Sequence, residues 1–522
     1  MKIKNMRILI LLFSLSTQSV FFAQPALSLN DNSYTYVKSN LEFLASDELE
    51  GRETASRGEK LASLFISEEL EKYGVKPFGD SGSYFQTFNM QVEGLTEESG
   101  ITFLFKDNSS ISYSITSDIA YSTNKLPRNK FANNEFEIVF AGYGIISEED
   151  DYDSYKNIDV AGKVVLILNG TPKNNGNEIL GVNAIRKYRW SSAKTNLAKS
   201  KNAVGVIILP DDENLMYWDY IINRSNSKSY SLEEEIERND EENIPIVYLN
   251  ENSAKTLLEN EKFSFEKLKK NINLKPDTFT LNAKVNFNYK TFTEIKPVRN
   301  VIGLIEGNDP ALKNEYVTIG AHYDHEGIKG SEIYNGADDN GSGTVTILET
   351  ARQLSLLKNN KRPILVIFHT GEEKGLKGST YLANNSSFVD NIISHINIDM
   401  VGRQSEDTIY CIGASRISTE LGQLVEQVNK ETVNFYLNYT FDSPTDPNRF
   451  YYRSDHISYA NKGIPIAFFY DYMQADYHKP SDTVEKINFT KIVKMVNLLE
   501  SLVLKISNLE HKLTVNNNIL VN

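Results

Sequence analysis

The chain has 522 residues, of which 40% are hydrophobic, and its formal net charge is −14 at pH 7. This length exceeds that of one ordinary domain and predicts two or three, with enough apolar residues for packed cores. The acidic balance argues against a general nucleic-acid-binding protein, which needs a basic face, so we expect no nucleic-acid partner.

The N-terminus has the pattern of a secretory signal peptide over residues 1–23. Lys2, Lys4 and Arg7 precede the apolar run ILILLFSLS, and Ala23 is a small residue at the expected cleavage point. The alternative is a membrane anchor, but the apolar core is short and is interrupted by Ser, Thr and Gln. We therefore expect export to the periplasm or the extracellular space. Since no later stretch approaches the roughly 18 apolar residues of a membrane span, we expect none after cleavage.

Two segments of different character follow. Residues 31–95 are predicted to form an N-terminal helical segment, because the run LASLFISEELEKYGV spaces its apolar residues as on one face of a helix. In residues 96–285, short strand-like runs such as FEIVFAGYGI, KVVLIL and AVGVIIL alternate with loops rich in Asn and Glu. This pattern predicts a separate β-rich domain.

Residues 286–510 alternate strands with helices. Strand-like runs include EYVTIGAHYD, RPILVIFHT, SHINIDMVG and GIPIAFFY, and helical runs include SGTVTILETARQLSLLK and the long closing stretch INFTKIVKMVNLLESLVLKISNLE. The alternation predicts an α/β fold with a mostly parallel central sheet sandwiched by helices. In such sheets, ligands bind beyond the carboxyl ends of the strands.

Polar side chains gather at those strand ends. Taken alone, each has an ordinary interpretation; an aspartate before a helix, for example, is usually an N-cap. Their convergence on one edge of a sheet predicts a metal site instead. The residues are His322, Asp324 and His325, Asp338 and Asp339, Glu372 and Glu373, Asp399, and Tyr477 and His478.

The ligand types fit two cations that share one carboxylate. His322 and Asp399 would hold one metal, Glu373 and His478 would hold the other, and Asp339 would bridge them. Imidazole and carboxylate ligands suit two Zn²⁺ ions, with Co²⁺ or Mn²⁺ as possible substitutes. Two such ions lower the pKa of a shared water and polarise a carbonyl, which predicts hydrolysis by a metal-bound hydroxide.

Two further side chains have predicted roles in that chemistry. Glu372 is next to a ligand without being one, so we expect it to act as the general base for the water. Asp324 lies two residues after His322, where it can accept the second N–H of the imidazole and hold its tautomer.

The motifs together resemble the co-catalytic di-zinc aminopeptidases, a family that includes secreted bacterial aminopeptidases and the glutamate carboxypeptidases. The motifs AHYDH, GADDNGSG, TGEEKGLKGS, NIDMVG and YHKPSDT appear in the family's order. LASDELEGRETASRGEK resembles the N-terminal segment of bacterial members, and residues 96–285 resemble the protease-associated domain that is often inserted between the two parts.

The resemblance implies a role for each matched position. It maps the ligands onto His322, Asp339, Glu373, Asp399 and His478, with Glu372 as the base and Asp324 as the orienting residue. The closing Ser-Gly of GADDNGSG favours Asp339 over Asp338 as the bridging ligand and implies a cis peptide bond between Asp339 and Asn340. Tyr477 matches a tyrosine that stabilises the oxyanion in some members.

One neighbouring motif has the letters of a catalytic triad. Ser454, Asp455 and His456 are consecutive, and consecutive residues cannot adopt triad geometry, which needs separate chain segments. Bacterial members of the family that the motifs resemble have a similar stretch, so we expect it to form part of the substrate pocket or to support the residues that do.

These observations predict a secreted metallo-exopeptidase that acts on peptide substrates and is, first of all, an aminopeptidase. A carboxypeptidase or dipeptidase of the same family stays open, because Arg403, Arg449 and Arg453 are available for a terminal carboxylate. A single-zinc glutaminyl cyclase and a non-catalytic receptor-like protein also stay open. The oligomeric state, the side-chain preference and the role of the inserted domain are not predicted.

Overall fold

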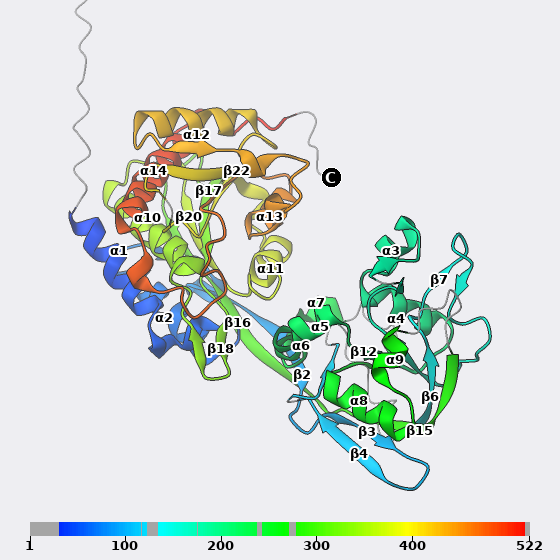
Figure 1. The fold of residues 1–522 in the computed structure, drawn as a ribbon. Coiled ribbons are helices and arrows are strands. Elements are labelled where there is room, and N and C mark those ends of the chain that lie inside the picture. Colours follow the sequence, from blue (N-terminus) through cyan, green and yellow to red (C-terminus); the bar gives the residue numbers. More distant parts are fainter. Residues whose placement is uncertain are drawn as a thin grey trace, which may run out of the picture.

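The computed structural model describes residues 31–115, 117–122, 134–174, 176–236, 243–270, 278–403 and 405–516. They form two bodies, each built around its own sheet (Figure 1). The expected signal peptide, residues 1–23, lies outside the described residues. Within these ranges, no helix is both long enough and apolar enough to cross a membrane.

The larger body contains a mixed sheet with a parallel centre. Its central strands β20, β17, β21 and β24 are parallel, as the alternation of strands and helices predicted. On one side, β16 runs antiparallel to both β20 and β2; on the other, β22 runs antiparallel to β24 and parallel to β23. In spatial order the strands are β13 Ser229–Leu232, β2 Phe85–Leu95, β16 Thr291–Ile305, β20 Ile364–His369, β17 Tyr316–His322, β21 Ile392–Asp399, β24 Ile466–Tyr470, β22 Thr408–Ile412 and β23 Tyr436–Asn438, with β1 Lys76–Pro77 beside β16.

Helices cover both faces of this sheet because its central strands are apolar on both sides. In β20, Val366 and Phe368 pack into one core cluster, whereas Leu365 and Ile367 pack into the opposite one. The first cluster is covered by α1 Asp31–Leu44, α2 Arg57–Lys72, α10 Gly343–Leu357, α12 Thr419–Glu431 and α14 Phe489–Ser507. The second is covered by α11 Lys377–Asn385 and α13 His456–Ala460.

The predicted helical segment over residues 31–95 is helical only in its first part. α1 and α2 match the prediction, but residues 85–95 form strand β2. Here Phe88, Met90 and Val92 are buried together while Thr87 and Asn89 are exposed. This period of two is that of a strand, and it overrides the helical extrapolation.

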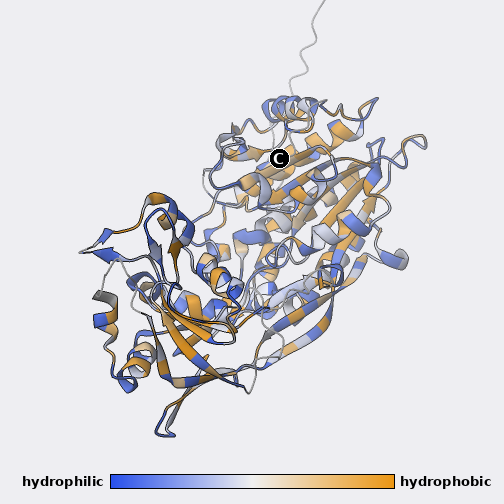
Figure 2. Ribbon diagram, turned by 90° about the vertical axis from the view of Figure 1, so that its right-hand side faces the viewer, coloured by the Kyte–Doolittle hydropathy of each residue, from blue (hydrophilic) through white to orange (hydrophobic). Residues whose placement is uncertain are grey.

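The smaller body lies within the predicted inserted segment and is β-rich. Its sheet contains a parallel run, β6, β9, β12 and β14, with antiparallel strands at both sides. Figure 2 shows hydrophobic residues concentrated along the strands. In order the strands are β4 Ser110–Ser114, β3 Gly100–Leu104, β15 Thr278–Asn288, β6 Glu135–Ala141, β9 Val164–Leu168, β12 Gly205–Leu209, β14 Ile246–Leu249 and β5 Ile119–Tyr121, packed against helices α4 Ser191–Ser200, α8 Glu251–Asn260 and α9 Phe265–Lys270.

The two bodies are joined by long paired strands and by one strand that crosses back. β2 and β16 pair from Leu95 and Thr291 to Phe85 and Val301 and lead from one body to the other (Figure 1). β13 comes from the middle of the segment 96–285, yet it pairs with β2 in the larger sheet. A short polar strand such as SYSL has no sequence signal for its distant partner, so only the tertiary structure reveals this crossing.

Candidate metal centre

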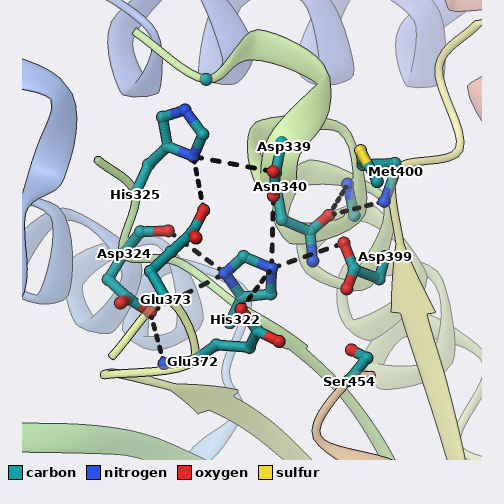
Figure 3. Close-up of polar contacts among 12 residues, drawn as sticks. His322, Asp324, His325, Asp339, Asn340, Glu372, Glu373, Asp399, Met400 and Ser454 are labelled. Atoms are coloured by element: carbon teal, nitrogen blue, oxygen red, sulfur yellow. Dashed lines mark hydrogen bonds and ion pairs between the residues drawn. The ribbon is translucent and has the colours of Figure 1, made fainter. Parts of the chain in front are cut away.

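Neighbouring parallel strands end at one edge of the larger sheet, and each brings a ligand type there (Figure 3). β17 ends at His322 and β21 ends at Asp399, while Glu372 and Glu373 follow the end of β20. The parallel direction of these strands explains the convergence, since all their carboxyl ends lie at the same edge. Asp339 reaches the site from the turn before α10.

A first group of buried ligand atoms surrounds His322. Its Nε2 lies 3.5 Å from Asp339 Oδ1 and 3.4 Å from Asp399 Oδ1. One imidazole nitrogen and two carboxylate oxygens therefore face one another closely enough to hold a single ion.

A second group lies on the other side of Asp339. His478 Nε2 is 3.2 Å from Asp339 Oδ2 and 3.1 Å from Glu373 Oε2. The two oxygens of Asp339 thus face different histidines, which is the arrangement that a bridging carboxylate requires. The structure brings together all five residues that the sequence predicts as ligands.

The chemistry of these donors fits two divalent cations. Asp339, Glu372, Glu373 and Asp399 place four carboxylates in one largely buried space, and uncompensated buried charges are costly. Asp399 Oδ1 is buried and has no hydrogen-bond partner in the part of the chain that the structure describes. Mixed nitrogen and oxygen ligands with room for a water match catalytic zinc sites.

The adjacent carboxylates Glu372 and Glu373 occupy different surroundings. Burial raises the pKa of Glu372 well above its usual range, and Glu373 and Asp399 add to the shift. Burial also acts to raise the pKa of Glu373, but His478 and His325 together hold it well below its usual range. Glu373 therefore belongs to the second ligand group, whereas Glu372 faces the neighbouring pocket.

Asp324 is positioned differently from our expectation. His322 Nδ1 lies 3.1 Å from the main-chain oxygen of Asp324, while the Asp324 carboxylate is 3.7 Å away. That carboxylate instead accepts hydrogen bonds from the Thr54 hydroxyl at 2.7 Å and from the Glu372 N–H at 3.2 Å. Asp324 therefore orients His322 through its backbone and orients the Glu372 segment through its side chain.

Two residues of the site have no role predicted from the sequence. His325 Nδ1 lies 2.8 Å from Glu373 Oε1, and Glu326 Oε1 lies 3.5 Å from His478 Nδ1. Each contact fixes the orientation of a residue in the second ligand group. The sequence gives a reason to expect His325 at the site, because it closes the motif AHYDH. It gives no such reason for Glu326, a single glutamate after the motif.

The turn that carries Asp339 is held by several polar contacts. The peptide bond between Asp339 and Asn340 is cis, which confirms the expectation. The Asn340 side chain accepts hydrogen bonds from the backbone N–H groups of Gly343 and Met400, which ties the turn to the end of β21. Asp338 accepts a hydrogen bond from the Gly402 N–H at 2.8 Å and belongs to neither ligand group.

A small pocket opens beside the metal-type ligands, with an empty volume of about 330 Å³ that is partly open to solvent. Asp339, Glu372, Asp399 and Tyr477 line it. Tyr477 stacks on His478 with ring centroids 3.8 Å apart. Burial raises the pKa of Tyr477, so its hydroxyl keeps the proton that a hydrogen bond to an oxyanion requires.

Ser454, Asp455 and His456 do not form a triad. Ser454 Oγ accepts a hydrogen bond from Asn397 Nδ2 at 2.9 Å, and His456 Nε2 donates to the main-chain oxygen of Tyr451 at 2.8 Å. The ring of His456 stacks on Phe468, a wall of the pocket. This stretch supports the pocket from behind.

The comparisons with known proteins agree with this geometry. Residues 300–503 match the model of Peptidase family M28, and residues 129–257 match that of the PA domain. Probable leucine aminopeptidase 1 of Trichophyton verrucosum is 29% identical over 226 residues, or 40% of this chain and 58% of that protein. Aminopeptidase Y of Saccharomyces cerevisiae is 30% identical over 197 residues, or 35% of this chain and 33% of that protein. The chain spans about half the length of the first curated relatives that it matches.

Solved structures share the fold over nearly the whole chain. The zinc aminopeptidase BSAP from Bacillus subtilis is 19% identical and has a TM-score of 0.54, with 90% of this chain and 94% of that one covered. An aminopeptidase from Aneurinibacillus sp. strain AM-1 is also 19% identical, with a TM-score of 0.52 and coverage of 90% and 93%. The resemblance noted in the sequence is confirmed: residues 300–503 match Peptidase family M28, and residues 129–257, which precede them in the chain, match the PA domain.

Proposed function

We propose that this protein is a zinc-dependent aminopeptidase that removes N-terminal residues from peptides. The observation that carries the proposal is the position of Asp339 between two imidazole-and-carboxylate groups, with Glu372 beside them at the pocket. The relatives named leucine aminopeptidase support it.

Each residue of the site has a defined task in such a reaction. When bound, two zinc ions held by the two groups around Asp339 supply polarisation of the scissile carbonyl and acidification of a water. Glu372 takes a proton from the attacking water as the C–O bond forms, and gives it to the amine as the C–N bond breaks. The Tyr477 hydroxyl donates a hydrogen bond to the oxyanion. Asp324 holds the backbone of Glu372 in place.

The positions of the arginines argue against a carboxypeptidase that binds the terminal carboxylate of its substrate through several arginines. Arg403 is paired with Asp476 and Asp482, and Arg449 lies over the ring of Tyr452. Of the three arginines that the sequence offered, only Arg453 lines the pocket. The acidic surroundings of the metals favour a substrate with a free α-ammonium group instead.

The same geometry favours a two-metal enzyme over a glutaminyl cyclase or a receptor-like protein. A single-zinc glutaminyl cyclase needs only one set of metal ligands. A non-catalytic receptor can lack some of the ligand residues. Here two groups are present, one around His322 and one around His478, and they share Asp339. We also propose export through residues 1–23, which N-terminal sequencing of the protein secreted by its host will test.

The activity is tested with zinc-loaded mature protein and matched peptides. We expect hydrolysis of Leu-Gly-Gly and of its C-terminal amide, and none of N-acetyl-Leu-Gly-Gly. Equal cleavage of the acetylated and free peptides overturns the aminopeptidase assignment. Cleavage that requires a free C-terminus indicates a carboxypeptidase instead.

A further inference from the structure

The pocket beside the metal ligands has apolar walls and one cationic side chain at its rim. Phe450, Phe468, Tyr470 and Met400 form the walls, and each is almost fully buried. Arg453 also lines the pocket, and its side chain is exposed. A substrate group that enters the pocket therefore meets a positive charge opposite the metal-type ligands.

Arg453 differs from Arg403 and Arg416 in its partners. Arg403 pairs with Asp476 and Asp482, and Arg416 Nε lies 2.7 Å from Asp442 Oδ1. No carboxylate of the described chain lies within ion-pairing distance of Arg453. Its Nη2 is 3.8 Å from the sulfur of Met473, which is a weak acceptor. The guanidinium therefore keeps most of its donors free.

The guanidinium also contacts one wall of the pocket. Its central carbon lies 5.0 Å from the centroid of the Phe450 ring, a cation–π distance. Phe450 is itself fixed, since it is buried and packs on Tyr470 with ring centroids 5.2 Å apart. A planar fork of N–H donors at a pocket rim matches a carboxylate, which it can bind through two parallel hydrogen bonds.

We infer that Arg453 binds a carboxylate of the substrate. The inference rests on the proposed function, because it concerns the pocket in which that reaction would occur. Two parts of a peptide offer this group: the side chain of an N-terminal Asp or Glu, and the C-terminal carboxylate of a short peptide. The carboxylates Asp339, Glu372 and Asp399 do not compete for Arg453, since their oxygens serve the metals and the water.

Two substrate pairs separate these sources. Glutamyl and glutaminyl p-nitroanilide differ only in side-chain charge, and Leu-Ala and Leu-Ala-amide differ only in the C-terminal charge. For the wild-type protein we expect kcat/KM to be about 10-fold to 100-fold higher for the charged member of one pair, as for a hydrogen bond to a charged group. The pair that responds identifies the source.

Variants of Arg453 test whether this side chain causes the difference in kcat/KM between the charged and the uncharged substrate. Arg453→Met, which keeps an apolar stem, should reduce the ratio to about one, mainly through a higher KM for the charged substrate. Arg453→Lys should retain part of it, because it keeps the charge without the fork. Arg449→Met, next to the pocket but not lining it, is the matched control. Zinc content and circular dichroism show whether each variant is folded.

A ratio near one for both pairs in the wild-type protein overturns the inference, as does a ratio that Arg453→Met leaves unchanged. If the wild-type protein hydrolyses no substrate, the proposed function fails instead. Calorimetry then still tests Arg453: the zinc-loaded protein should bind the charged member more tightly in one of two pairs, the α-amide of glutamic acid against glutaminamide or Leu-Ala against Leu-Ala-amide, and Arg453→Met should remove the difference. Equal binding within both pairs overturns the inference in that case.

Discussion

The Tyr230 hydroxyl donates a hydrogen bond to Glu53 Oε1 at 2.9 Å, so a strand supplied by the inserted segment contacts the N-terminal segment beside the metal centre. Lys228 Nζ lies 3.1 Å from Glu53 Oε2, and Lys374 Nζ lies 3.8 Å from Glu53 Oε1. Lys374 directly follows Glu373, which we propose as a metal ligand. The inserted segment is therefore linked through Glu53 to the loop that carries Glu373.

This link predicts that Tyr230→Phe lowers both stability and activity. Loss of a hydrogen bond to a charged acceptor should cost about 1–3 kcal/mol of unfolding free energy. We expect a several-fold loss of kcat/KM, because the loop that carries Glu373 loses a support. Denaturant unfolding and peptide hydrolysis measure the two effects. Tyr217→Phe, at a tyrosine that is 55% exposed, is the control, and equal behaviour of the two variants contradicts the link.

The two neighbouring glutamates should behave differently when each is changed to glutamine. Glu372→Gln should keep its zinc and lose about 10²-fold to 10⁴-fold in kcat, the usual contribution of a general base. Glu373→Gln should lose zinc from the second group, because a neutral amide is a weaker ligand than a carboxylate. Metal analysis beside kcat separates the outcomes. A Glu372→Gln variant with full activity rules out the general-base role.

Removal of the metals should destabilise the larger body alone. Without cations the four carboxylates repel one another, and metal at 100 times its dissociation constant should restore about 2.7 kcal/mol. Both tryptophans, Trp190 and Trp218, lie in the smaller body, so their fluorescence reports that body. We expect a chelator to lower the unfolding midpoint seen by circular dichroism and to leave the fluorescence midpoint unchanged. A fluorescence midpoint that falls equally contradicts this prediction.

The smaller body should become more stable as the pH rises above neutral, because of Lys194. This side chain is fully buried, its Nζ donates hydrogen bonds to the main-chain oxygens of Leu168 and Gly170, and burial lowers its pKa to about 7. The unfolded chain titrates near pH 10.4. Between these values the unfolded state binds a proton that the folded state lacks, so stability rises with pH.

Lys194→Met should remove this slope, which is at most about 1.4 kcal/mol per pH unit. Urea unfolding followed by tryptophan fluorescence from pH 7 to pH 9.5 measures it. Lys156→Met, at an exposed lysine of the same body, should keep the slope of the unmodified protein. Identical slopes for the unmodified protein and Lys194→Met refute the assignment.

Much of the larger body was predictable because its signals are local. The apolar runs around β17, β20 and β21 are short and are followed at once by polar residues, so both the strands and the ligand types at their ends could be read directly. β2 was missed because the helical pattern that ends at Lys72 was extended across the turn-rich residues that precede Phe85. β13 was placed in the inserted domain because a short strand carries no information about a partner far along the chain.

By itself, the sequence determined which residue types stand at the strand ends and in the loops that follow them: His322, Asp339, Glu373, Asp399 and His478. Only the tertiary structure decided how they are oriented. In the structure the Asp324 carboxylate accepts hydrogen bonds from Thr54 and Glu372, and not, as the sequence had predicted, from His322. His325 contacts Glu373, and Arg453 is the one of the three candidate arginines that lines the pocket. The physical reason is that a ligand's identity is set by its own residue, whereas its orientation depends on hydrogen-bond partners that distant segments supply.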